Sequence, residues 1–139
     1  EEHDTLAVPL DVGVVKEPVA VNMGNPHCVF FVDDVMTLDS ADIGPEVEKH
    51  PLFPQKTNVE FAQVKSPENI RMRVWERGAG ITQACGSGAC ATIVAAVRRG
   101  LASRKAAVVL DGGTLHFHWR AEDAHILMTF VFDGVLGDI

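Results

Sequence analysis

Apolar and polar side chains alternate along most of the chain with a period of two, the pattern that is typical of half-buried β-strands. In "TLHFHWR", for example, Leu115 and Phe117 fall on one face, while His116 and His118 fall on the other. The segment "DGG" at Asp111–Gly113 favours a tight hairpin just before that strand. Strands are predicted at Val12–Lys16, Val19–Met23, Cys28–Asp33, Asn58–Lys65, Ile70–Glu76, Ala107–Asp111, Thr114–Ala121 and Ile126–Phe132.

Two segments break this alternation and predict helices. Ser40–His50 begins with a capping residue and early acidic side chains, and it ends with basic ones. Ser87–Arg99 begins after glycines and is followed by Gly100, a typical C-terminal cap. Its middle, "ACATIVAAV", is apolar all round, which predicts a helix buried on every side. We therefore expect an α+β fold over residues 1–139, a single domain whose mixed β-sheet curls around a central buried helix.

Composition narrows the class of protein. The chain has 139 residues, of which 47% are hydrophobic and 22% charged, as in ordinary globular domains. The formal net charge of −7 argues against nucleic acid and anionic membrane surfaces as partners. No apolar run has the length of a membrane span and no signal peptide is recognisable, so a cytoplasmic location is expected. The chain opens on Glu1 rather than Met, and we expect a fragment or a processed piece.

The cysteines provide the first candidate chemistry. Three cysteines indicate neither a disulfide framework nor a four-ligand zinc site. Cys85 precedes the apolar helix, where unpaired backbone N–H groups and the helix dipole should lower its pKa below about 8.5. The same N–H groups can bind a carboxylate or phosphate, with Gly86 allowing close approach and Ser87 capping or donating. The alternative is that Cys85 is a small residue in a tight turn; Cys90, inside the helix, is interpreted as core.

A charged pair lies shortly before this helix. Glu76 and Arg77 end a predicted strand and enter the loop "GAG". They could be a solvated pair, which is common at strand ends. Alternatively, the strand delivers both side chains to a site, where Arg suits a carboxylate ligand and Glu suits an ammonium group or a neighbouring thiol.

Polar residues elsewhere give weaker signals. "NMGNPHC" either forms a turn or brings Asn25 and His27 to the mouth of a site. Asn58, which begins "NVEFAQV", is equally ambiguous. His116 and His118 could hold a metal, but without further ligands at suitable spacing a solvated strand face is favoured, and no metal site is predicted.

Three segments, "NMGNPHCVFF", "TNVEF" and "WERGAGITQACGSGACA", together resemble diaminopimelate epimerases, in this order and at plausible spacings. The resemblance covers nearly the whole chain but only the second half of the family's usual length. It implies the C-terminal domain of a two-domain fold, with the N-terminal domain absent. The first half of such enzymes carries its own catalytic cysteine in a Cys-Gly-Asn motif, whereas Cys28 here is followed by Val29.

The resemblance also implies a reaction. Members of this family are cofactor-independent epimerases that interconvert LL- and meso-diaminopimelate, a step towards lysine and peptidoglycan. Two thiols on opposite faces of the α-carbon exchange its proton. By resemblance, Cys85 is one of these thiols, Glu76 assists it, and His27 assists the other, absent thiol. The implied substrate-binding set is Asn25, Asn58, Glu76, Arg77, Gly86 and Ser87.

The expected partners are therefore diaminopimelate, the missing N-terminal half and a second copy in a homodimer. The chain alone is expected to be inactive, because it supplies one thiol of two. Two alternatives remain open: a proline racemase-like or phenazine-biosynthesis-like isomerase, and a non-catalytic ligand-binding or assembly module.

Overall fold

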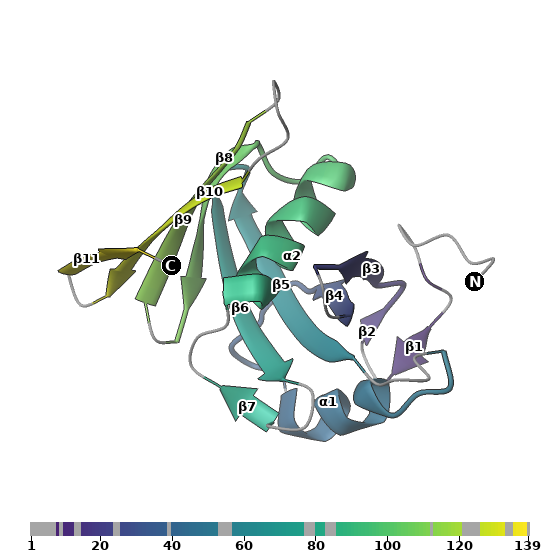
Figure 1. The fold of residues 1–139 in the computed structure, drawn as a ribbon. Helices are drawn as coiled ribbons and strands as arrows, with labels where there is room; N and C mark the ends of the chain where they lie inside the picture. The colour runs from purple at the N-terminus through teal and green to yellow at the C-terminus, as the bar shows by residue number, and fades with distance from the viewer. Residues whose placement is uncertain are drawn as a thin grey trace.

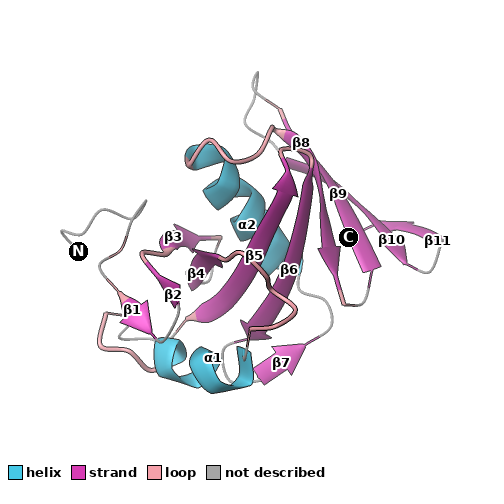
Figure 2. Cartoon of the chain, turned by 180° about the vertical axis from the view of Figure 1, so that it is seen from behind, coloured by secondary structure: helices cyan, strands magenta, loops and turns pink. Residues whose placement is uncertain are grey.

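A mixed nine-stranded sheet with helices on its two faces forms the body of the molecule (Figures 1 and 2). The structure is a computed structural model that describes residues 8, 10–12, 15–23, 26–38, 40–52, 57–76, 80–82, 86–111, 113–120, 126–132 and 135–138. Neighbouring strands follow the order β11-β10-β9-β8-β6-β5-β4-β3, and β7 pairs with β6. The pairs β4–β5 and β6–β8 are parallel, and the other pairs are antiparallel.

The strands of this sheet are β3 (Val19–Asn22), β4 (Pro26–Phe31), β5 (Asn58–Ser66), β6 (Asn69–Glu76), β7 (Gly80–Thr82), β8 (Lys105–Leu110), β9 (Gly113–Trp119), β10 (Ile126–Phe132) and β11 (Val135–Asp138). A separate antiparallel pair is formed by β1 (Asp11–Val12) and β2 (Val15–Lys16). The helices are α1 (Ser40–Glu48) and α2 (Gly86–Arg98). Neither helix has the length and apolar character that a membrane-spanning helix needs.

Helix α2 lies in the concave face of the sheet, which confirms the expected fold class. It contacts β3, β4 and β5 as well as β8 and β9, although these strands are far apart in the sheet. A flat sheet could not reach one helix from both ends, so the sheet curls around α2. In Figure 1, β8–β11 lie on one side of α2, while β3 and β4 lie on the other.

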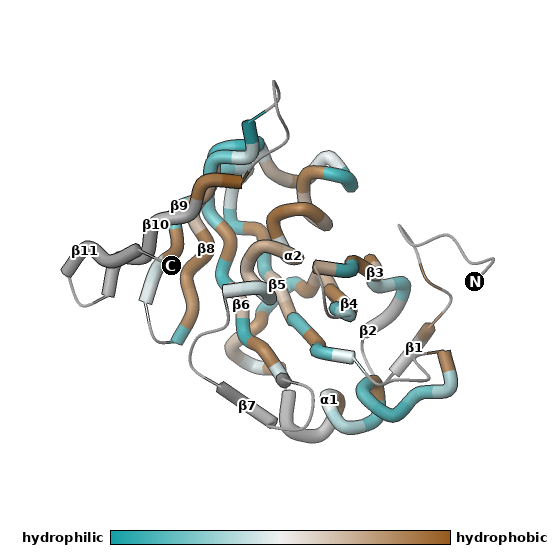
Figure 3. The backbone as a smooth tube through the Cα atoms, in the orientation of Figure 1, coloured by the Kyte–Doolittle hydropathy of each residue, from teal (hydrophilic) through white to brown (hydrophobic). Residues whose placement is uncertain are grey.

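The apolar composition of α2 explains why it occupies the centre. Its residues are hydrophobic along most of its length, as the colouring of the tube in Figure 3 shows. Ala89, Ile93 and Ala96 are fully buried in a core that includes residues of β6, β8 and β9. The prediction that this helix is buried on every side was only partly right. Cys90 and Val94 pack against the core but are only half-buried.

The C-terminal end of α2 has the glycine cap that the sequence predicts. Gly100 adopts a φ of 74°, a left-handed conformation that a residue without a Cβ adopts without strain. Its N–H donates to the carbonyl of Val97 (3.0 Å), and the N–H of Leu101 donates to the carbonyl of Ala96 (2.8 Å). These two bonds form a Schellman motif, which ends the helix and satisfies two of its last carbonyls.

Alternation along the strands is confirmed on both faces. Leu115 and Phe117 are buried against α2, whereas His116 and His118 are exposed. The hairpin predicted at "DGG" is present, since Leu110 of β8 pairs directly with Gly113 of β9.

Several predicted boundaries were wrong. Val12–Lys16 is not one strand: β1 and β2 pair with each other, with Val12 opposite Val15. The strand predicted at Cys28–Asp33 begins two residues earlier, at Pro26, because β3 and β5 both pair with that end. Strands β7 and β11 were not predicted, since three or four residues are too few to show a period and depend on pairing with a longer neighbour.

Candidate active site

The candidate site lies at one end of three adjacent strands. His27 of β4 is the register partner of Asn58 of β5. Val59, the next residue of β5, pairs with Trp75 of β6, so Asn58 and Glu76 begin and end their strands side by side. The sheet therefore brings together three chain positions from segments that are distant in the sequence.

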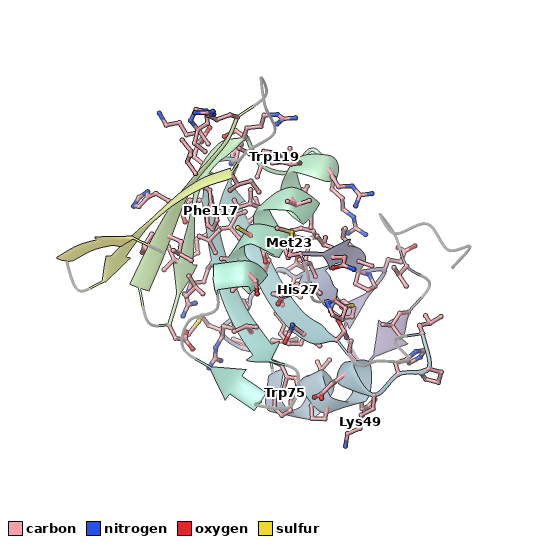
Figure 4. The ribbon with its side chains drawn as sticks, in the orientation of Figure 1. Met23, His27, Lys49, Trp75, Phe117 and Trp119 are labelled. Atoms are coloured by element: carbon pink, nitrogen blue, oxygen red, sulfur yellow. The ribbon has the colours of Figure 1, made fainter. Side chains whose placement is uncertain are left out.

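His27 faces the α2 side of the sheet. Val29, two residues along β4, belongs to the core around α2, whereas the intervening Cys28 belongs to the core on the α1 side. The side chain of His27 is fully buried (Figure 4), although a histidine carries two polar ring nitrogens. A buried imidazole requires hydrogen-bond partners.

One partner of His27 is Glu60 of β5. The imidazole Nδ1 lies 2.7 Å from the carboxylate Oε2 of Glu60, and both side chains have no exposed surface. An ionised carboxylate can only accept a hydrogen bond, so with Glu60 ionised Nδ1 is the donor. Sequence reasoning did not identify Glu60 as a site residue. The available signal was an acidic residue at an inward-facing position of a strand whose neighbours Val59, Phe61 and Ala62 are fully buried.

Asn58 is also buried, with 5% of its surface exposed. Its Nδ2 donates to the backbone carbonyl of Pro26 at 3.3 Å. This bond links the first residue of β5 to the first residue of β4 and fixes the amide beside His27.

The start of α2 is tied to the same end of β6. Thr82 of β7 pairs with Val74 of β6, and α2 begins at Gly86, four residues after Thr82. Four residue steps span at most about 15 Å, so α2 begins within that distance of Thr82. No acidic side chain is present in the first turn of α2, and the positive end of the helix dipole there favours an anion.

Gly86 and Ser87 are the first two residues of α2, and both are half-buried. The following Gly88 is buried, and its carbonyl accepts a hydrogen bond from the hydroxyl of Thr92 at 2.9 Å. The first turn is thus packed into the molecule, while its opening residues remain accessible.

The neighbouring thiol, Cys28, has a different environment. Burial, with a further contribution from the negative charge of Glu60, raises the pKa of Cys28 well above its usual value. The thiol therefore stays protonated at neutral pH, as expected of an inert core residue.

The predicted site residues are described to different extents. His27, Asn58, Gly86 and Ser87 are described, and Glu76 is described through its backbone as the last residue of β6. Asn25, Arg77 and Cys85 lie outside the described residues.

Comparison with known proteins places this arrangement in a family. The sequence profile described as "Diaminopimelate epimerase" matches residues 19–131, which run from the start of β3 to the next-to-last residue of β10. The chain belongs to the diaminopimelate epimerase family. This agrees with the resemblance carried by the three sequence segments, and it accounts for the mixed sheet around one central helix.

Similar curated proteins carry the same name. The chain is 60% identical over 127 residues to the diaminopimelate epimerase of Rhodospirillum centenum, covering 91% of this chain and 43% of that protein. It is 53% identical over 140 residues to that of Acidiphilium cryptum, covering 98% and 50%, respectively. The chain thus spans about half the length of the curated relatives that it matches.

Solved structures of similar fold come from the PhzF family of phenazine biosynthesis proteins. The protein from Bacillus anthracis has a TM-score of 0.55 and 25% identity, covering 78% of this chain and 35% of its own. The protein from Enterococcus faecalis has the same TM-score and 15% identity, covering 70% and 35%, respectively, and shows the shared fold alone.

Proposed function

We propose that the chain forms one half of a diaminopimelate epimerase, the enzyme that interconverts LL- and meso-diaminopimelate on the way to lysine and peptidoglycan. The observation that carries this proposal is the name shared by relatives that are 52–60% identical over most of the chain. We infer that residues 1–139 are the single C-terminal domain, and that a second domain supplies the rest of the site. A cytoplasmic location follows from this biosynthetic role.

The proposed mechanism moves one proton in and one proton out at the α-carbon. One thiolate removes the α-proton, and the thiol on the opposite face donates its own proton to the same carbon. Configuration inverts, the charges of the two thiols are exchanged, and no pyridoxal phosphate or other cofactor takes part. Cys85 is one of these thiols, and the missing half contributes the other.

Two side chains of this chain assist the thiols. Glu76, the last residue of β6, supplies the carboxylate that assists Cys85. His27, on the α2 side of β4, serves the thiol of the missing half as its acid–base partner.

The substrate is held by its charged groups. N–H groups at Gly86 and Ser87 bind the α-carboxylate, where the start of α2 also stabilises the negative charge that develops at the α-carbon. Arg77 pairs with a carboxylate of diaminopimelate, and Glu76 pairs with one of its ammonium groups. Asn25 and Asn58 form hydrogen bonds with the polar groups at the ends of the substrate. With only one thiol, the isolated chain binds diaminopimelate without epimerising it.

A second candidate function is that of a phenazine-biosynthesis-like isomerase, favoured by the TM-score of 0.55 to a PhzF-family protein. The sequence argues for the epimerase, because identity to that protein is 25%, against 60% to a diaminopimelate epimerase. A proline racemase-like enzyme would share the two-thiol chemistry but act on another amino acid.

A substrate panel separates these functions. The full-length gene product is incubated separately with LL-diaminopimelate and L-proline, and the stereoisomers are resolved by chiral chromatography. We expect conversion of LL- to meso-diaminopimelate and no racemisation of proline. Racemisation of proline alone, or conversion of neither substrate, would overturn the proposal.

A further inference from the structure

The contact between His27 and Glu60 joins two distant parts of the sequence and is completely buried. The two residues are 33 positions apart, on adjacent parallel strands, and their side chains meet at 2.7 Å with no exposed surface. The parallel register places Glu60 opposite Val29, so the carboxylate reaches back along the sheet towards the ring.

The packing of the sheet does not require an acid at this position. Val59, Phe61 and Ala62 of the same strand are fully buried and apolar. Removing a carboxylate from water costs several kcal/mol, and well-packed apolar residues often replace buried ion pairs without loss of stability. The carboxylate must therefore be explained by what it does to His27.

We propose that Glu60 is a positioning residue for the epimerase reaction: it accepts the Nδ1–H of His27 and thereby assigns proton exchange to Nε2. This inference rests on the proposed function and deepens it. Nε2 of the neutral ring takes the proton of the missing half's thiol, which leaves a thiolate and an imidazolium. The thiolate then takes the α-proton of the substrate while Nε2 keeps its own proton. In the reverse reaction this thiol donates its proton to the α-carbon, and Nε2 then returns its proton to the resulting thiolate. The Nδ1–H to Glu60 bond persists throughout.

The carboxylate has two effects in this arrangement. It holds the imidazole in one orientation and one tautomer, as carboxylates do for histidine bases in hydrolases. It also stabilises the positive charge that forms on the ring.

The test uses the full-length gene product and the variant Glu60→Gln, which keeps the shape and removes the charge. We expect kcat to fall about 10²-fold in both directions, the usual contribution of a positioned acid–base partner, with little change in KM. The imidazole ¹⁵N shifts of His27, assigned by their loss in His27→Gln, should change from a single Nδ1–H tautomer to a mixture. An unchanged kcat, or a fall in kcat with the tautomer unchanged, would overturn the proposal.

A matched control is Glu48→Gln. Glu48 is also a buried glutamate that accepts a ring N–H, from Trp75 at 2.8 Å, but it belongs to the α1 side of the sheet. Its amide oxygen can still accept that bond, so this variant should keep the native kcat.

Two further measurements test the proposal if Glu60→Gln does not fold or if the native protein has no epimerase activity. If Glu60→Gln does not fold, Glu60→Asp retains a carboxylate farther from the ring; an intermediate kcat supports the role and a native kcat contradicts it. If the native protein epimerises nothing, the proposed function has failed, whereas the tautomer of His27 still reports whether Glu60 positions the ring.

Discussion

At the scale of single residues, local surroundings give the cysteines different chemistry. Cys28 is fully buried, and burial raises the pKa of its thiol. Cys90 is half-buried in the middle of α2. Cys85 precedes the first residue of α2, and we propose that this end of the helix favours its thiolate.

This difference predicts the order of alkylation. Iodoacetamide at pH 7.5 should modify Cys85 of the full-length protein before Cys90 and long before Cys28, because the thiolate is the reacting form. Peptide mass spectrometry over time measures the three rates, and diaminopimelate should slow only that of Cys85. If Cys85 titrated like free cysteine and gained no protection, the non-catalytic ligand-binding module would be favoured instead.

The sequence reveals site residues where a local motif carries the chemistry. The glycines around Cys85 and the segment "NPH", which ends with His27, are such motifs. Glu60 was missed because its role depends on a partner 33 residues away, across a parallel strand pair. No local pattern encodes that pairing.

At the scale of elements, α1 is fitted closely onto the outer face of β6. A Cβ atom built at Gly44 would lie 2.5 Å from Cγ of Trp75, closer than any normal contact. The indole N–H of Trp75 donates to Glu48 one turn later in the same helix. Together these contacts fix Trp75, the residue before Glu76.

Gly44→Ala should therefore destabilise the protein, although alanine is the better helix former. Helix propensity would contribute about 1 kcal/mol in favour of alanine, whereas overpacking of this kind costs about 1–3 kcal/mol and moves the indole. Urea unfolding measures the difference, with the exposed Glu46→Ala of the same helix as control. A Gly44→Ala variant as stable as the control would contradict the proposed fit.

A second contact between elements joins β6 to the β8–β9 turn. Arg71 and Arg73 both hydrogen-bond the carboxylate of Asp111, and Arg71 also donates to the carbonyl of Val109 at 3.1 Å. Partial burial raises the pKa of Asp111, but the hydrogen bond and charge of Arg71, with those of Arg73, outweigh it. The pKa therefore lies below its ordinary value.

This lowered pKa predicts how stability depends on pH. The ionised carboxylate stabilises the fold above the unfolded-state pKa of about 3.9, and this contribution is lost as pH falls through the lower folded-state pKa. Asp111→Asn should cost about 1 kcal/mol or less at pH 7, because the pair is partly solvated. The urea unfolding midpoints of Asp111→Asn and the native protein, measured at pH 7 and pH 3, test this prediction. The difference between the two midpoints should be smaller at pH 3 than at pH 7, and an equal difference at both pH values would contradict the account.

Sequence pattern predicted the elements better than their pairing. Alternation identified the inward face of β9, and the glycine after Arg99 marked the end of α2. The strand order and the two parallel pairs arise from contacts between distant segments, which alternation does not specify. The half-buried side of α2 was missed for a related reason, since composition indicates an apolar helix but not which side the sheet leaves uncovered.

At the scale of the whole molecule, the curled sheet gathers residues from separate segments around the start of one helix. His27, Asn58 and the end of β6 share one end of the sheet, and α2 begins four residues after Thr82, which pairs with β6. The chain spans about half the length of its relatives. We proposed that Cys85, before α2, is one of two thiols that the reaction needs. We therefore expect that the other half of the protein must be present before the α-carbon of diaminopimelate can lose a proton on one face and gain one on the other.

Exchange of the α-proton of LL-diaminopimelate with heavy water, followed by proton NMR, tests this account most directly. The full-length gene product should incorporate deuterium at the α-carbon while forming the meso isomer. Cys85→Ala in the full-length protein and the 139-residue chain alone should both fail to produce the meso isomer. Steady inversion by the Cys85→Ala variant, or by the isolated chain, would contradict the claim that Cys85 is one of two thiols that the reaction requires.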